Sequence, residues 1–166
     1  MSEMRGYFEI GVYMPKTEHN IGTLWRSAYQ LGAAGIFVIG PRYKKQVSDT
    51  CKTWRHIPLR QFADFESFHD ARPYDCLLVG VEMGGEPLTF YQHPQRVIYL
   101  LGMEDSGLPA AIMKRCQQLV ELESIRTPSF NVAVAGSIVM YDRIAKGLTG
   151  NGLAIVQDEQ HKMGVV

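Results

Sequence analysis

Residues 96–107 read RVIYLLGMEDSG, a largely apolar run that passes directly into a short polar loop bounded by glycines. The near-continuous apolar character predicts a strand covered on both faces, as in a parallel sheet flanked by helices. The polar loop then lies beyond the carboxyl end of this strand, where open α/β sheets bind ligands. Two further polar clusters of this kind occupy residues 20–26 and 129–133. We therefore expect three loops to form one composite site.

The rest of the chain alternates between short apolar runs and stretches with helical character. This alternation predicts a mostly parallel sheet flanked by helices. We expect Asn20 to cap the first helix and Gly147 to end the last one. Residues 1–150 are predicted to form a single domain and residues 151–166 a C-terminal tail. The expected strands are 7–13, 35–39, 74–81, 96–101 and 118–122, and the expected helices are 20–31, 60–69, 109–116 and 130–146.

The composition of the chain is that of an ordinary globular domain, with 166 residues, 46% hydrophobic residues and a formal net charge of zero. No apolar run approaches the roughly 18 residues that cross a membrane, and the N-terminus lacks a signal-peptide pattern. We therefore expect a cytoplasmic protein. Cys51, Cys76 and Cys116 have no metal-ligand spacing, so we expect reduced thiols and no metal site.

The positive charge of the chain is concentrated in one segment. Residues 42–60 contain six Lys or Arg residues and a single Asp, a local excess of 6 − 1 = +5. Such a stretch can bind phosphates, and its aromatic residues Tyr43 and Trp54 can stack on unpaired bases. The segment is either an RNA-binding surface or simply a solvated loop.

The three polar clusters together resemble the motifs of the SPOUT superfamily of RNA methyltransferases, specifically its SpoU/TrmH branch. One such motif alone would arise by chance, whereas three in the family's order are much harder to dismiss. The resemblance covers roughly residues 8–147, with a shortened segment at 125–128 and Ala133 in place of a common serine or threonine. The matching residues are Asn20, Gly22 and Arg26 in the first motif, Gly102, Glu104 and Gly107 in the second, and Ser129 and Asn131 in the third.

The resemblance implies a fold that periodicity alone does not suggest. Members of the family are α/β proteins with a deep C-terminal trefoil knot, which binds S-adenosylmethionine in a bent conformation. They also form homodimers, often through the first and last helices. This agrees with a last helix that is apolar on more than one face.

The activity that the resemblance implies is methyl transfer from S-adenosylmethionine to a ribose 2′-hydroxyl of RNA. We expect transfer RNA rather than ribosomal RNA, because a domain without an RNA-binding appendage suits a compact substrate. Arg26 is the catalytic residue by position, and its guanidinium would hold the substrate phosphate and stabilise charge on the attacking oxygen. Asn20 and Glu104 would orient Arg26, while Ser129 and Asn131 would complete the polar wall. The expected cofactor-binding residues are Leu78, Val79, Gly80, Leu101, Gly102, Ile125 and Phe130.

Other interpretations of the same residues stay open at this point. Arg26 could be a solvated surface arginine or a partner for Glu18, and Ser129 could serve only as a helix cap. The chain could also be a catalytically silent RNA-binding module or a flavodoxin-like oxidoreductase. The intact motif residues argue against the silent module. The absence of a Gly-x-Gly-x-x-Gly fingerprint from residues 11–22 argues against an oxidoreductase with an ordinary nucleotide-binding fold.

Overall fold

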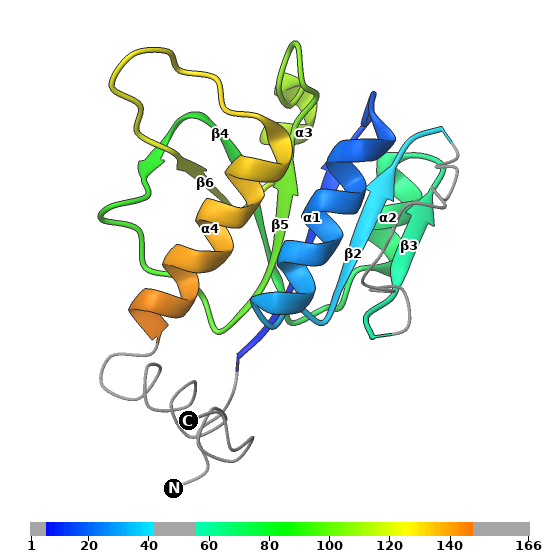
Figure 1. Ribbon diagram of the computed structural model, residues 1–166. Coiled ribbons are helices and arrows are strands. Elements are labelled where there is room, and N and C mark those ends of the chain that lie inside the picture. Colours follow the sequence, from blue (N-terminus) through cyan, green and yellow to red (C-terminus); the bar gives the residue numbers. More distant parts are fainter. Residues whose placement is uncertain (1–5, 42–55, 148–166) are drawn as a thin grey trace, which may run out of the picture.

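A parallel sheet of six strands forms the middle layer of the molecule, and helices cover both of its faces (Figure 1). The computed structural model describes residues 6–41 and 56–147. The spatial order of the strands is β3-β2-β1-β5-β4-β6, and every neighbouring pair is parallel. The elements are β1 Tyr7–Tyr13, α1 Glu18–Gln30, β2 Gly35–Ile39, β3 Leu59–Phe62, α2 Phe65–Ala71, β4 Leu77–Pro87, β5 Arg96–Leu101, α3 Ala110–Met113, β6 Gln118–Glu121 and α4 Val132–Gly147.

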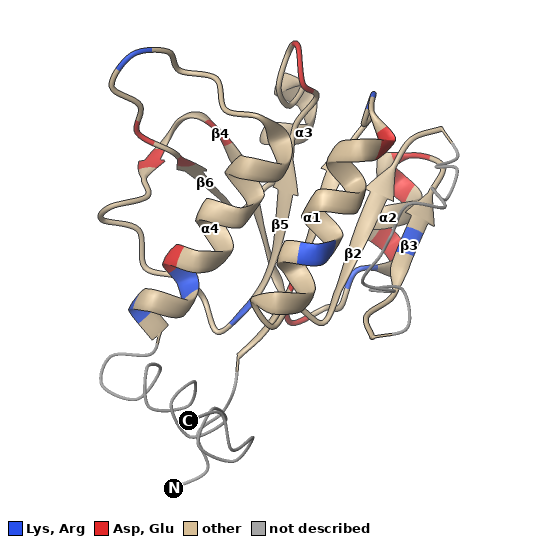
Figure 2. Ribbon diagram, viewed as in Figure 1, with Lys and Arg blue, Asp and Glu red and all other residues tan. Residues whose placement is uncertain are grey.

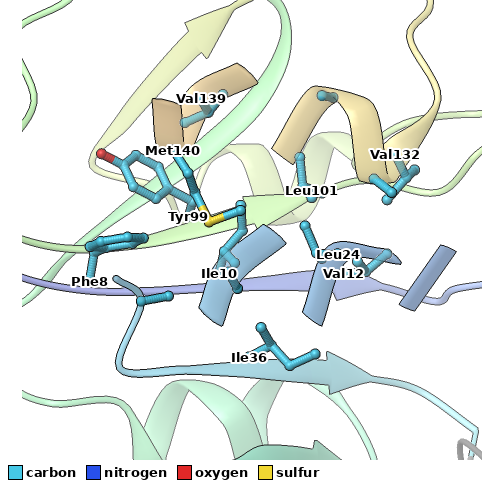
Figure 3. Close-up of a cluster of buried hydrophobic side chains, with 14 of the residues drawn as sticks. Phe8, Ile10, Val12, Leu24, Ile36, Tyr99, Leu101, Val132, Val139 and Met140 are labelled. Carbon is cyan, nitrogen blue, oxygen red and sulfur yellow. The ribbon is translucent and has the colours of Figure 1, made fainter. Parts of the chain in front are cut away.

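The side chains of β5 alternate between two separate hydrophobic clusters. Val97, Tyr99 and Leu101 belong to the cluster that contains the buried residues of α1 and α4, part of which is drawn in Figure 3. Ile98 and Leu100 belong to the other cluster, together with residues of α2 and α3. Because both faces of the strand are buried, nearly every position is apolar. This confirms the mostly parallel, helix-flanked sheet, whereas the trefoil knot stays a prediction from the resemblance.

The predicted strands 7–13, 35–39 and 96–101 match β1, β2 and β5 in their bounds. Residues 118–122 were expected as a strand, and β6 covers Gln118–Glu121. The predicted tail at residues 151–166 lies outside the described residues. Within the described part of the chain, no helix has both the length and the apolar character needed to cross a membrane.

The predicted helix at residues 60–69 is wrong in its first half. Leu59–Phe62 forms the edge strand β3, which pairs with β2 in the register Ile36↔Leu59. Helix α2 begins only after Asp64, whose side chain accepts a hydrogen bond from the Ser67 backbone N–H, at 2.8 Å, as part of a capping box. The strand is stabilised by its neighbour in the sheet, so the local pattern does not reveal it.

Two further elements differ in length from the prediction. Helix α3 has only four residues and ends at Met113, before the expected end at 116. Strand β4 begins at Leu77 rather than residue 74, and it continues to Pro87 with a register shift between Val81 and Glu86 against β6. Residues 82–87 therefore extend the sheet beyond the expected strand end.

Arg60, the last cation of the basic segment, forms an ion pair with a buried carboxylate of the fold. Its Nη2 lies 2.5 Å from Oε2 of Glu9, whose side chain is only 6% exposed. The Tyr7 hydroxyl donates to the other oxygen of Glu9 at 2.7 Å. Burial, and then the hydrogen bond to Glu9, raise the pKa of Tyr7 to about 12. Arg60 thus compensates a buried charge. Residues 42–55 of the predicted RNA-binding segment lie outside the described residues.

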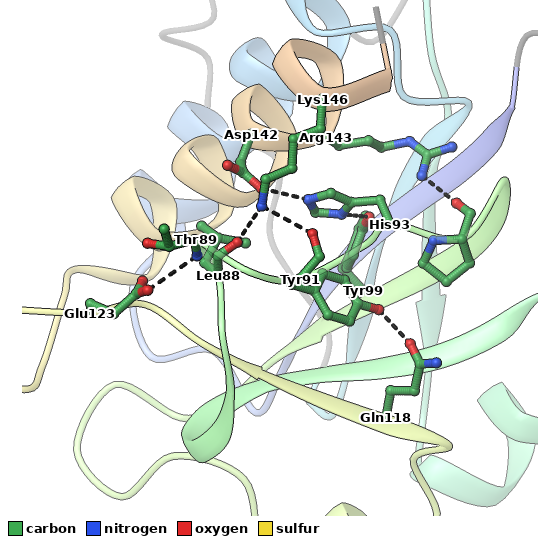
Figure 4. A network of polar contacts seen from close by, with 11 residues as sticks. Leu88, Thr89, Tyr91, His93, Tyr99, Gln118, Glu123, Asp142, Arg143 and Lys146 are labelled. Atoms are coloured by element: carbon green, nitrogen blue, oxygen red, sulfur yellow. Dashed lines mark hydrogen bonds and ion pairs between the residues drawn. The ribbon is translucent and has the colours of Figure 1, made fainter. Parts of the chain in front are cut away.

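A polar network holds the C-terminal half of α4 to the segment between β4 and β5 (Figure 4). The buried ring of His93 contacts the Tyr99 hydroxyl through Nδ1 at 2.5 Å and Asp142 Oδ2 through Nε2 at 2.7 Å. Lys146 Nζ lies 2.8 Å from the same Asp142 oxygen and donates to the backbone oxygens of Leu88 and Tyr91. Burial lowers the pKa of His93, although Asp142 opposes this shift. Neutral His93 therefore donates to Asp142 and accepts from Tyr99.

This network predicts a pH-dependent stability. Because the pKa of His93 is lower in the folded chain, the unfolded chain takes up its proton first as the pH falls below about 6.5. The free energy of unfolding should therefore decrease from pH 7.5 to pH 5. We expect His93→Gln to cost about 2 kcal/mol at pH 7.5 and to make this decrease smaller. Urea unfolding at several pH values measures both effects.

His19, which is exposed on α1, provides the matched control. His19→Gln should keep the pH dependence of the wild-type chain. If His93→Gln kept it as well, His93 would not be the titrating group.

Candidate functional site

The three motif loops meet through two hydrogen bonds between their side chains. Nδ2 of Asn20 donates to Oε1 of Glu104 at 2.7 Å, and Nδ2 of Asn131 donates to Oδ1 of Asn20 at 3.0 Å. Asn20 is only 8% exposed, so its amide links the loops from a buried position. Residues separated by 84 and 111 positions in the sequence are joined at the carboxyl edge of the sheet.

The predicted capping role of Asn20 is wrong. Helix α1 begins at Glu18 and follows Thr17, whose side chain makes no capping hydrogen bond. The Thr17 hydroxyl instead donates to Glu104 at 2.9 Å. Asn20 therefore lies inside the first turn of the helix, and its polar groups are satisfied by the other two motifs.

The second motif is a closed turn. Met103 and Gly107 exchange backbone hydrogen bonds of 3.0 and 2.9 Å, and Gly107 has a φ of +67°, a conformation that favours glycine. A side chain at Gly102 would overlap the backbone of Gly107 and Leu108. The two glycines thus allow the loop to fold back tightly against the end of β5.

The third motif begins α4, and Asn131 is its capping residue. Oδ1 of Asn131 accepts hydrogen bonds from the backbone N–H groups of Ala133 and Val134, at 3.0 and 3.2 Å. Ser129 lies two residues before Asn131, is exposed and does not cap the helix. The interpretation of Ser129 as the cap is therefore wrong, and its side chain is free to face the cavity described next.

A cavity of about 250 Å³ opens beside the second and third motifs. Its walls combine apolar side chains with carboxylates and with the whole second motif. Glu104 and Ser129, two of the predicted polar residues, lie in this wall. The cavity is lined by residues 81–83, 101–107, 121–122, 128–130, 132 and 135.

The predicted cofactor-binding residues divide into two groups. Leu101, Gly102 and Phe130 line the cavity. Leu78, Val79, Gly80 and Ile125 do not belong to its lining.

The residues of the second group lie outside the cavity for two different reasons, burial within the sheet and exposure to solvent. Leu78 and Val79 are completely buried within the sheet, and a side chain at Gly80 would overlap Leu119 of β6. The site therefore begins at Val81, one residue later along the strand. Ile125 is fully exposed.

Sequence reasoning missed Glu82 and Glu121, which both line the cavity. Each is an ionisable residue at the carboxyl end of a strand or its extension, which is the signal that could have identified it. Of the carboxylates in the lining, Asp105 forms an ion pair with Lys16. Within residues 6–41 and 56–147, Glu82, Glu104 and Glu121 form no ion pair with a cation. The wall of the cavity therefore carries an excess of negative charge.

Arg26 lies apart from this cavity. It is exposed on α1 and is absent from the cavity lining. Within residues 6–41 and 56–147 it takes part in none of the ion pairs. The expectation that Asn20 and Glu104 orient Arg26 is therefore wrong within a single chain, since both side chains are directed to other partners.

An apolar groove lies between α1 and α4, which run side by side on one face of the sheet (Figure 1). It encloses about 530 Å³, and Thr23 of α1 lies in its wall, close in sequence to Arg26. Val134 and Tyr141 line the groove although they are 47% and 65% exposed. Figure 2 shows that the front of α4 is free of charged residues over most of its length. This helix face is thus apolar and uncovered in the single chain.

Comparison with known proteins places these features in a family. The family model described as "SpoU rRNA Methylase family" matches residues 7–141. The mouse protein tRNA (guanosine(18)-2′-O)-methyltransferase TARBP1, from Mus musculus, is 26% identical over 144 residues. The match covers 79% of the present chain but only 9% of the mouse protein.

Two solved structures have the same arrangement of elements. One concerns 2-OH methylation of C/U34 on tRNA and matches with a TM-score of 0.75 and 25% identity, covering 87% of this chain and 92% of that one. The other is the SpoU methyltransferase AviRb from Streptomyces viridochromogenes in complex with AdoMet. It matches with a TM-score of 0.75 and 23% identity, covering 88% of this chain and 60% of that one. The second likeness shows the fold alone.

Proposed function

The chain belongs to the SpoU rRNA methylase family, and we propose from this membership that it transfers a methyl group from S-adenosylmethionine to a ribose 2′-hydroxyl of RNA. The observation that carries the proposal is the linkage of all three motifs beside one cavity through Glu104, Asn20 and Asn131. Transfer RNA is the favoured substrate, because the mouse relative is named a tRNA 2′-O-methyltransferase and the first solved structure concerns methylation of tRNA.

The cavity fits S-adenosylmethionine by the chemistry of its lining. Leu122, Phe130 and Val132 offer apolar surfaces for an adenine ring, and the carboxylates offer negative charge to a sulfonium and an ammonium group. The turn of the second motif presents backbone groups to the same space. Bound S-adenosylmethionine supplies a methyl group on positively charged sulfur, whose carbon–sulfur bond breaks with its electron pair left on sulfur as the ribose oxygen bonds to the carbon.

The residues of the chain must orient the hydroxyl and stabilise it as it loses its proton. A guanidinium stays charged at neutral pH, so Arg26 acts as a cation and not as a base. It holds the substrate phosphate and stabilises negative charge on the ribose oxygen while the proton passes to water or phosphate. Asn20 holds Glu104 in place at the cavity wall, and Asn131 fixes the start of α4 beside them.

We propose that the active form is a homodimer in which a second copy covers the groove between α1 and α4. The exposed apolar side chains of α4 would then be buried, as expected for a face that is hydrophobic without a partner in the chain. Arg26 follows Thr23 of the groove wall by three positions on α1, so it lies near the contact between the two copies. From there it can serve the cavity of the second chain.

The dimer predicts a specific effect of a charge in the groove. Tyr141→Asp would place a carboxylate against the apolar face of the second copy, so the dimer dissociation constant should rise by about 30-fold or more. Sedimentation equilibrium measures this constant. Tyr74→Asp is the matched control, because Tyr74 is also an exposed tyrosine but lies outside the groove. Equal dimerisation of the two variants would exclude the groove as the interface.

The activity itself is tested with labelled S-adenosylmethionine and separate pools of unmodified transfer and ribosomal RNA. Digestion of each pool to nucleosides identifies the methylated product. A 2′-O-methyl nucleoside from transfer RNA is the expected result. The same product from ribosomal RNA would identify ribosomal RNA as the substrate instead. RNA binding without cofactor binding or methyl transfer would instead identify a catalytically silent module.

A further inference from the structure

Glu82 connects the end of β4 to the loop of the second motif, and both segments line the cavity. It follows Val81 on β4, where the strand continues into the extension that pairs with β6. Its Oε2 accepts a hydrogen bond from the Leu108 backbone N–H at 2.7 Å, directly after the second motif. Its Oε1 accepts from the backbone N–H of Met83 at 2.9 Å. The carboxylate is therefore held in one orientation by two donors.

The second motif leaves room for this carboxylate. A side chain on Gly107 would overlap the Glu82 carboxylate, and the left-handed conformation of Gly107 would strain any other residue. The glycine thus allows a charged group to lie against the turn and to line the cavity. A carboxylate has more acceptor sites than the two backbone donors occupy, so it can still interact with a ligand.

The donors that hold Glu82 are neutral. No lysine or arginine side chain is paired with it in the described ranges, and the cavity lining contains no Lys or Arg. The charge of Glu82 therefore remains available to a cationic ligand in a site that is partly closed to water. Glu121, whose Oε2 accepts from the Gly84 backbone N–H at 3.1 Å, adds a second carboxylate of the same kind.

We propose that Glu82 is a specificity-determining residue that makes the cavity favour the sulfonium cofactor over its thioether product. This inference rests on the proposed methyltransferase function. S-adenosylmethionine carries one positive charge more than S-adenosylhomocysteine, and the two molecules are otherwise nearly the same in shape. A fixed carboxylate in the lining attracts the charged form and loses this attraction after transfer. Glu82 would thus favour exchange of the product for fresh cofactor.

The test is the ratio of two dissociation constants, measured by calorimetry on the full-length chain. Glu82→Gln keeps the size of the side chain and removes its charge. We expect the ratio of the constant for S-adenosylhomocysteine to that for S-adenosylmethionine to fall about fivefold. A loss of packing alone weakens both ligands equally and leaves the ratio unchanged, so the ratio separates charge from structure.

Two further variants complete the design. Glu86→Gln makes the same charge change on the same strand, outside the cavity lining, and should leave the ratio at its wild-type value. Glu121→Gln removes the second carboxylate without affecting the contact to Leu108, and it should lower the ratio as Glu82→Gln does. It keeps the inference testable if Glu82→Gln does not fold.

An unchanged ratio in Glu82→Gln, or an equal fall in Glu86→Gln, would overturn the inference while leaving the proposed function intact. If Glu82→Gln did not fold, an unchanged ratio in Glu121→Gln would overturn it in the same way. A wild-type chain that binds neither ligand would overturn the proposed function and this inference together.

Discussion

Arg26→Ala is expected to lower methyl transfer to RNA by about a thousandfold while the affinity for S-adenosylmethionine stays within about twofold. The guanidinium is exposed and outside the cavity lining, so its removal leaves the cofactor site intact. The charge that develops on the ribose oxygen then has no cation beside it. Single-turnover transfer and calorimetry measure the two quantities separately. Arg115→Ala, which removes a surface arginine paired with Glu66, is the control and should transfer at the wild-type rate.

Mixed dimers show whether Arg26 serves its own chain or the partner. Arg26→Ala and Glu104→Ala are each expected to be inactive, because one lacks the cation and the other a group of the cavity wall. The two variants are mixed in equal amounts and allowed to exchange subunits, so that half of the dimers contain one chain of each variant. If Arg26 acts across the interface, each mixed dimer holds one intact site of two, and about a quarter of wild-type activity returns. Mixing should restore none if Arg26 acts within its own chain. The second outcome would contradict the role proposed for the dimer in catalysis.

Gly102→Ala is expected to have the second large effect, because Gly102 lines the cavity and its substitution would disrupt the turn of the second motif. The added methyl group would overlap the backbone of Gly107 and Leu108, which cannot move without opening the turn. We expect cofactor affinity and methyl transfer to fall about a hundredfold, and the free energy of unfolding to fall by about 2 kcal/mol. Calorimetry and urea unfolding measure these changes.

Gly147→Ala is the control for this substitution. Nothing lies within 4 Å of the position where its methyl group would stand, at the end of α4. Its stability should change by less than about 0.5 kcal/mol, and cofactor binding should not change. Wild-type affinity in Gly102→Ala would mean that the turn is not part of the cofactor site.

Local patterns were sufficient for the elements whose residues carry their own signal. The continuous apolar run of β5 predicts a strand buried on both faces because each successive side chain enters a different hydrophobic cluster. The same reasoning failed at Leu59–Phe62, where pairing with β2 stabilises a strand that its own residues do not specify. Strand β4 was predicted too short because its extension depends on pairing with β6.

The candidate site also combines features that the local sequence predicts with features that only the folded chain reveals. The motif residues Asn20, Glu104 and Asn131 were identified from the resemblance to the SpoU/TrmH motifs, and the structure joins them by hydrogen bonds. The hydrogen bonds between these side chains were not predictable. Asparagine is a common helix-capping residue, and only the folded chain brings Glu104 close to Asn20. Glu82 directly follows the predicted strand 74–81, a position that could have identified it, but only the folded chain shows its hydrogen bond to Leu108, which is 26 residues away.

By itself, the sequence determined the alternation of strands and helices, the three polar loops at the sheet edge and the family to which they belong. These features depend on the periodicity of apolar residues and on short motifs, which are local properties. The tertiary structure alone decided that Arg26 stands apart from the cavity and that Leu78 and Val79 are core residues. It also decided that Glu82 lines the cavity. The direction and burial of a side chain depend on strand register and on distant contacts. The neighbouring residues in the sequence determine neither the register nor these contacts.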